Sequence, residues 1–181
     1  PPGSCPANQP ALANNCAAAC VLCDFQGFTS NNNNLNTGQQ VPSDFCPGNP
    51  IQPHNVQWVG FVAWTPDVTF NLTVENCQLG NGLQVGVWET ADCDSFNLVS
   101  QCSYQVNPNT PTPFSMNGLT VGATYFFVVD GFDDDFCDFS VDVPVGSTEV
   151  PPVLGIPNIV PSIPPPYCPG STVTFTANGV Q

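Results

Sequence analysis

The chain contains no lysine and no arginine, and against this absence stand 14 acidic residues and a single histidine, His54. The formal net charge is −14, so no salt bridge to a lysine or arginine can form within the chain. Burial of apolar side chains, backbone hydrogen bonds and disulfides must therefore hold the fold. Nucleic acids are excluded as partners, because their binding relies on lysine and arginine neutralising phosphates. An anionic membrane surface would repel the chain, and the sequence has no apolar run of about 18 residues that would predict membrane insertion.

The cysteine content points to an oxidising compartment. Ten cysteines in 181 residues predict disulfides and export, hence an extracellular or cell-surface location. Eight of them are assigned to disulfides of the first domain: Cys16, Cys20, Cys23, Cys46, Cys77, Cys93, Cys102 and Cys137. Most of the pairing is left open. Cys93 and Cys102 could join neighbouring strands across a short loop, and Cys77 and Cys137, each at a strand end, could meet across the sandwich.

The middle of the chain has the period of β-strands. Val68–Glu75 alternates apolar with polar residues, as does the segment from Asp138 to Val143, and this pattern is typical of strands with one buried face. Further strands are expected at 56–65, 83–88, 96–101, 114–116 and 124–129, separated by turns rich in glycine and asparagine. About seven strands at this spacing predict an all-β fold, an antiparallel jelly-roll-like β-sandwich.

Composition divides the chain into four parts. Residues 1–55 hold five cysteines and little periodicity, so they are predicted to form a disulfide-rich irregular segment packed on the sandwich, with a short helix conceivable only at 11–22. Residues 56–143 form the sandwich. The proline-rich residues 144–167 are predicted to be a semi-rigid linker. Alternation restarts in 168–181, which is expected to be the first strand of a truncated second β domain.

Two stretches resemble the bacterial pre-peptidase C-terminal domain. They are 54–63, with its W-x-x-F strand, and 118–131, which reads L-x-x-G-x-x-Y-x-x-x-V-D-G. That family is a small jelly-roll-like β-sandwich appended to secreted proteins. The cysteines of 16–23 and the segment 130–139 are similar to a cysteine-rich variant found in large surface adhesins exported by the type IX secretion system. In such proteins, segments like 168–177 open Ig-like or PKD-like domains. The resemblance implies architecture and location and carries no catalytic residues.

Five aspartates within nine residues form the sharpest candidate site: Asp130, Asp133, Asp134, Asp135 and Asp138. Carboxylates this close together repel one another, and a divalent cation would relieve the repulsion. Calcium takes about six to eight oxygen ligands from carboxylates and carbonyls. The spacing is not that of an EF-hand. Calcium is therefore the one predicted cofactor, and a solvated acidic loop is the alternative.

Two tryptophans and one asparagine are candidates for binding or modification. Trp64 and Trp88 could point outward and form a sugar-stacking platform, or the cysteine-rich segment could cover them. Asn71 begins the sequence Asn-Leu-Thr, a glycosylation sequon on the polar face of its strand.

No catalytic set is recognisable. His54 is the single side chain expected to titrate near neutrality, but no G-x-S-x-G elbow accompanies it. The three glutamates at positions 75, 89 and 149 suggest no acid and nucleophile pair for glycoside hydrolysis. The three cysteines of 16–23, with Cys46 and His54, could bind zinc, but disulfides are favoured in an exported chain. The sequence therefore predicts a protein that is not an enzyme.

The leading functional hypothesis is a non-catalytic extracellular module of a large secreted or cell-surface adhesin, acting in adhesion or as a structural spacer. A subunit of an extracellular filament or sheath is one alternative, and an accessory domain of a secreted hydrolase is another. The expected partners are neighbouring domains of the same polypeptide, surface polysaccharide or other copies of the chain.

Overall fold

The computed structural model describes residues 12–33, 39–42, 45–46, 53–149, 151, 158–162 and 174–178. The chain divides into two compact units, Pro1–Val150 and Pro151–Gln181, and each is described by itself. Among the described residues, no helix has the length and apolar character needed to cross a membrane.

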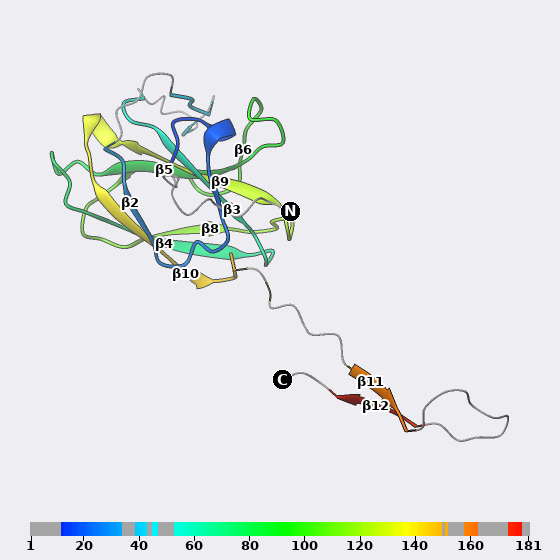
Figure 1. Cartoon of the computed structure of the whole chain (residues 1–181). Coiled ribbons are helices and arrows are strands. Elements are labelled where there is room, and N and C mark those ends of the chain that lie inside the picture. The colour runs from blue at the N-terminus through cyan, green and yellow to red at the C-terminus, as the bar shows by residue number, and fades with distance from the viewer. Residues whose placement is uncertain are drawn as a thin grey trace. The chain divides into compact units, whose positions relative to one another are not determined.

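The first unit is a β-sandwich whose two sheets are almost entirely antiparallel, which confirms the predicted fold class (Figure 1). Sheet A contains β1 (Val21–Leu22), β3 (Gln57–Val62), β5 (Leu83–Glu89), β6 (Asn97–Leu98), β7 (Ser103–Val106) and β9 (Thr124–Gly131). Its order is β1–β3–β9–β5–β6, and β7 also pairs with β5. Sheet B contains β2 (Phe28–Asn31), β4 (Val68–Glu75), β8 (Thr112–Met116) and β10 (Asp138–Val145), in the order β2–β10–β4–β8.

The burial of each strand follows its sequence pattern. In β4, the apolar residues from Val68 to Val74 are buried and the polar residues between them are half-buried, so sheet B has one face on the core and one face in solvent. In β3, every residue is buried, because sheet A is covered on both faces. The core between the sheets contains several phenylalanines whose rings are in contact, and Phe70 meets both Phe61 and Phe127 edge to face.

The amino-terminal segment contributes strands to both sheets, which corrects the prediction that it is irregular. β1 runs parallel to β3, and β2 runs antiparallel to β10. The short helix that the sequence allowed at 11–22 is also not formed by the described residues 12–22, which contain a 3-10 turn at Cys16–Ala18 and the strand β1. Backbone hydrogen bonds in both directions join Ala13 to Trp58, at 2.9 and 2.7 Å. This pairing with β3 overrides the helix propensity of the alanines.

The outer face of sheet A carries a second apolar cluster, which confirms that the amino-terminal segment packs on the sandwich. It contains Trp58 of β3 and Trp88 of β5 together with Phe45 and Cys46 of the amino-terminal segment, and the ring of Phe45 packs on Trp88. Gly86 makes room for this arrangement, because a Cβ at this position would overlap the indole ring of Trp88.

Three disulfides join described cysteines: Cys16–Cys93, Cys46–Cys102 and Cys77–Cys137. The third confirms the predicted pairing of Cys77 with Cys137, but the bond joins the end of β4 to the start of β10, which are neighbouring strands of sheet B, and does not cross the sandwich. The predicted bond between Cys93 and Cys102 is wrong, because each of the two binds a cysteine of the covering amino-terminal segment instead. Cys20 is also disulfide-bonded, whereas the Cys23 thiol is free and exposed, so the disulfide predicted for Cys23 is wrong. Disulfides in this number are typical of proteins from oxidising compartments.

The described part of the second unit is a pair of antiparallel strands, β11 (Asn158–Pro161) and β12 (Phe175–Asn178). β12 lies within the segment 168–181, where a strand was expected. The linker prediction for 144–167 is wrong at both ends of this range, since β10 continues to Val145 and β11 is a paired strand. Asn158-Ile159-Val160 has no proline, and Pro161 takes the last position of its strand, where a missing backbone donor costs least.

Candidate functional site

The predicted calcium ligands lie where β9 leaves sheet A and the chain crosses to β10 in sheet B. Asp130 is near the end of β9, and Asp133 and Asp134 form a tight 3-10 turn in which both residues have a positive φ, 53° and 63°. Asp135 follows the turn, and Asp138 begins β10. The crossing turns the five carboxylates in different directions. Asp130 and Asp135 are fully buried, and the other three are exposed.

Asp135 is fully occupied by backbone amides. Its carboxylate accepts hydrogen bonds from the amides of Leu79 (2.8 Å), Asn81 (2.6 Å), Gly82 (2.9 Å) and Phe136 (2.9 Å). Three of these donors belong to the turn between β4 and β5. The carboxylate therefore fixes that turn against the β9–β10 crossing, in the way that backbone amides bind an anion.

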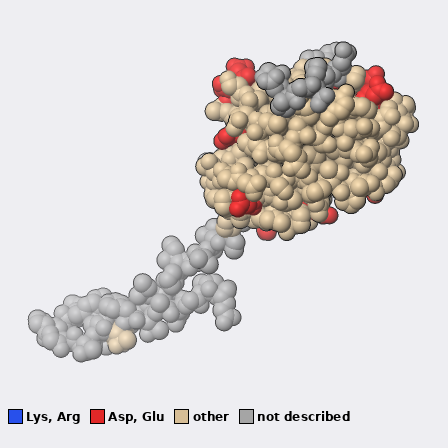
Figure 2. All heavy atoms as spheres, turned by 180° about the vertical axis from the view of Figure 1, so that it is seen from behind, with Lys and Arg blue, Asp and Glu red and all other residues tan. Residues whose placement is uncertain are grey.

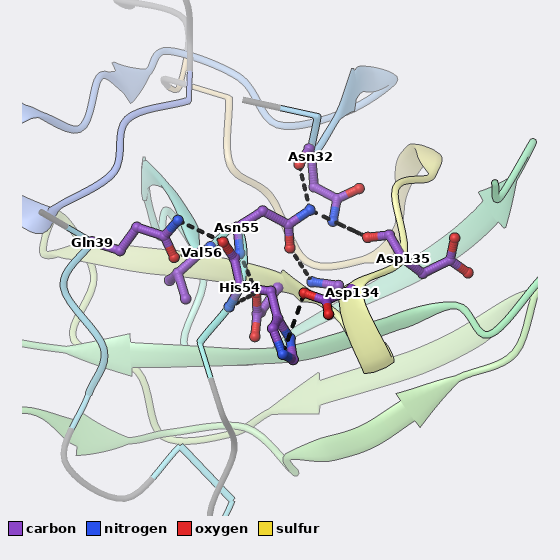
Figure 3. Close-up of polar contacts among 9 residues, drawn as sticks. Asn32, Gln39, His54, Asn55, Val56, Asp134 and Asp135 are labelled. Atoms are coloured by element: carbon purple, nitrogen blue, oxygen red, sulfur yellow. Dashed lines mark hydrogen bonds and ion pairs between the residues drawn. The ribbon is translucent and has the colours of Figure 1, made fainter. Parts of the chain in front are cut away.

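Two buried asparagines tie the same crossing to the amino-terminal part of the chain (Figure 3). The Asn32 side chain accepts from the amide of Cys137 (2.7 Å) and donates to the carbonyl of Asp135 (3.0 Å). The Asn55 side chain accepts from the amide of Gly131 (2.7 Å) and donates to the carbonyls of Asn32 (2.7 Å) and Asp135 (3.2 Å). A Cβ on Gly131 would overlap the Asp135 carbonyl oxygen, so this close packing requires glycine there.

Asp130 has one oxygen bonded and one oxygen without a partner. Its Oδ1 accepts from the amides of His54 (3.3 Å) and Asn55 (2.9 Å), whereas its buried Oδ2 has no hydrogen-bond partner among the described residues. Burial raises the pKa of Asp130 above the ordinary value of 3.8, and the two amides and the nearby His54 oppose this effect only in part.

His54 forms the one ion pair found among the described residues. Its Nε2 lies 3.4 Å from Oδ1 of Asp134, and the side chains are 27% and 73% exposed. Because the Asp134 carboxylate is exposed to solvent, the pair contributes little to stability. The Nδ1 atom is buried and has no partner in the described part of the chain, and no described serine or cysteine hydrogen-bonds to the ring. The described residues around His54 thus do not assemble a nucleophile with a base.

Replacing Asp130 by asparagine should make stability less dependent on pH. The raised pKa means that the contribution of Asp130 to stability is fully present below about pH 3.8 and is lost as the pH rises through its folded-state pKa. An asparagine side chain cannot titrate, so D130N should gain stability relative to the wild type as the pH rises from about 3 to about 7. Urea unfolding midpoints across this range measure the difference.

Asp133→Asn is the matched control, because it removes an exposed carboxylate from the adjacent turn. Its midpoints should run parallel to those of the wild type. If the urea midpoints of D130N also run parallel to those of the wild type across this pH range, ionisation of the buried Asp130 carboxylate does not destabilise the fold.

The arrangement does not bring the predicted calcium ligands together as one set. Among the described residues, the only three candidate metal ligands whose atoms lie within 4.8 Å of one another are Cys77, Asp135 and Cys137. Two of these are joined as a disulfide, and the third is occupied by amides. Asp138 binds the Asn76 side chain at 2.9 Å on the outer face of sheet B. Calcium binding stays a prediction.

The remaining candidate residues, Trp64, Trp88 and Asn71, differ in their exposure to solvent. Trp88 is 1% exposed, and the ring of Phe45 packs on it at 4.8 Å between centroids. The predicted ligand platform is therefore wrong for Trp88, and coverage by the cysteine-rich segment is confirmed. Trp64 is half-buried. Asn71 is half-buried on the outer face of β4, between Asp142 and Pro113 of the neighbouring strands, and its glycosylation stays a prediction.

Sequence reasoning missed the two asparagines that hold this end of the sandwich. Asn32 lies in a tract that reads as low complexity, Asn31–Asn34, and Asn55 is 76 residues from its partner Gly131. No local pattern reveals such pairs. No family model, curated protein or solved structure matches the chain, and the resemblance to the pre-peptidase C-terminal domain stays a prediction.

Proposed function

We propose that the chain is a non-catalytic extracellular module of a large secreted or cell-surface protein, acting in adhesion or as a structural spacer. The observation that carries the proposal is how the buried polar side chains are used. The side chains of Asn32, Asn55 and Asp135 are engaged with backbone groups of three separate segments, so they stabilise loops rather than face a cavity.

The disulfides support the same proposal. Cys16–Cys93 and Cys46–Cys102 fasten the amino-terminal segment over the outer face of sheet A, and Cys77–Cys137 links the end of β4 to the start of β10. Covalent links of this kind suit a module that must stay folded outside the cell, where a chain without lysine or arginine also offers no site to trypsin-like proteases.

The test uses the full 181-residue chain, oxidised and coupled to beads. The beads flow over glass coated with polysaccharide or with protein, and the soluble chain is assayed against ester, peptide and glycoside substrates. Retention on a coated surface would assign adhesion, and its absence would assign the spacer role. Retention on a neutral polysaccharide should persist in high salt, because hydrogen bonds to an uncharged ligand do not depend on the charge–charge attraction that salt screens. Turnover of any substrate that is lost in His54→Ala would contradict the proposal.

A further inference from the structure

The outer face of sheet B is hollowed along β2, β4 and β10. One hollow of about 470 Å³ is lined mainly by Thr29, Asn31, Thr73, Glu75, Asp138 and Ser140. A second hollow of about 340 Å³ adjoins it and shares Asn31, Asn76 and Asp138 with it. We call the two together the outer-face groove. The larger volume falls in the range of about 300–1,000 Å³ that is typical of sites for small molecules.

The strand register arranges these side chains in two rows. Asp138 of β10 lies between Asn31 of β2 and Glu75 of β4. Two residues further along β10, Ser140 lies between Thr29 of β2 and Thr73 of β4. The residues between the rows face the core, so both rows point outward. Neighbouring strands lie about 5 Å apart, and positions two residues apart along a strand lie about 7 Å apart.

Most of these polar groups are unused inside the protein. The side chains of Thr29, Thr73 and Ser140 form no hydrogen bond to another described residue. Thr69 on the same face of β4 behaves differently, since its hydroxyl is paired with that of Ser115 at 3.1 Å. The groove therefore presents free hydroxyls, whereas the rest of the strand face uses its hydroxyls internally.

The charge of the groove selects the kind of ligand. Glu75 and Asp138 face each other across the strands, and no lysine or arginine exists anywhere in the chain to offset them. Figure 2 shows the consequence for one face of the molecule, on which acidic residues are scattered and basic residues are absent. An anionic ligand would be repelled, whereas a neutral polyol can donate its hydroxyls to the carboxylates.

A protein partner fits the groove less well. The centre of a protein interface is usually apolar and rich in aromatic side chains. The large hydrophobic residues that are exposed in the described part, Leu79, Tyr104, Val121 and Val145, do not line either hollow.

We propose that the outer-face groove binds a neutral polysaccharide chain, with the free hydroxyls and the opposed carboxylates hydrogen-bonding to sugar hydroxyls. This inference rests on the proposed adhesive role and gives it a ligand class and a site.

Native gel electrophoresis in gels that contain a soluble neutral polysaccharide tests the inference. Dextran, galactomannan, xylan and mixed-linkage β-glucan are the probes, alginate is the anionic comparison, and the net charge of −14 drives the full chain through the gel. At least one neutral probe should retard the wild type, and alginate should not. The double variant T73V/S140A should bind that probe at least about tenfold more weakly. Thr69→Val on the same strand face is the matched control and should bind within about twofold of the wild type.

The outcomes separate the groove from the broader proposal. Retardation by no neutral probe, by alginate alone, or equally in T73V/S140A and the wild type would overturn the inference. Loss of retardation in EDTA would also overturn it, because a bridging cation would then make the contact. If T73V/S140A no longer binds the probe in gels while beads that carry this variant are still retained in flow, the groove binds the probe, and another surface of the protein accounts for the adhesion in flow. If beads that carry T73V/S140A are retained like those that carry the wild type, and no neutral probe retards the wild type in gels, the inference about the groove is contradicted and the proposed adhesive function is kept.

Discussion

Replacing Phe25 by alanine is expected to lower the free energy of unfolding by about 3–5 kcal/mol. Phe25 lies between β1 and β2 in the segment that sequence reasoning treated as a wrap, yet it is completely buried. Its ring lies 4.9 Å from that of Phe70 in sheet B and 5.4 and 5.6 Å from those of Phe61 and Phe127 in sheet A. Alanine would leave a cavity where the two sheets meet, and the surrounding rings can fill it only in part.

Guanidinium unfolding of the oxidised protein measures this loss. Leu79→Ala is the control, because the Leu79 side chain is 57% exposed and its removal should change stability by less than about 0.5 kcal/mol. A loss below about 1 kcal/mol for Phe25→Ala would mean that the segment is only an outer cover. The hydrogen bond from the Phe25 amide to Thr148 (2.9 Å) is kept in the variant, so the experiment isolates the ring.

Strand positions could be predicted because their signal is local. β4 has the predicted bounds, and β9 and β10 exceed theirs by only a few residues, since alternation with a period of two is visible within a single strand. β2 was missed, because Phe28–Asn31 is short, carries one apolar residue and runs into the asparagine tract. Its strand character comes from pairing with β10, more than a hundred residues away.

The candidate site could be predicted only as a set of residues. The sequence brings five aspartates together, but the fold separates them, because Asp130 lies near the end of a strand of sheet A and Asp138 starts a strand of sheet B. The Asp135 carboxylate is held by backbone amides of 79–82, and the Asp130 carboxylate is held by the amides of His54 and Asn55. Composition shows the charges and not the backbone groups that hold them.

The pairing of Cys93 and Cys102 was predicted wrongly for the same reason, because the partners are far away in the sequence. Cys93 and Cys102 are close in the sequence, and proximity favoured a bond between them. In the fold, each faces a different cysteine of the amino-terminal segment, with sequence separations of 77 and 56 residues. The signal that could have indicated this is the pair of tryptophans on the outer face of sheet A, which needed a cover fastened from outside.

Removing the Cys46–Cys102 disulfide should expose Trp88 and lower the free energy of unfolding by about 2–5 kcal/mol. Phe45, which packs on Trp88, is next to Cys46, so this bond holds the ring that covers the indole. The variant C46A/C102A should therefore show red-shifted tryptophan emission and stronger acrylamide quenching while still folded. A Cys23→Ser background prevents exchange with the free, exposed thiol.

The variant C77A/C137A is the matched control for this experiment. It removes a disulfide with a similar sequence separation, 60 against 56 residues, but from the end of β4, away from the tryptophan cluster. It should lose a similar amount of stability, because the two loops closed are of similar length. Its folded-state emission should match that of the wild type. Equal emission from C46A/C102A and the wild type would instead mean that apolar packing alone keeps Phe45 on Trp88, and that the disulfide contributes stability without being needed for the cover.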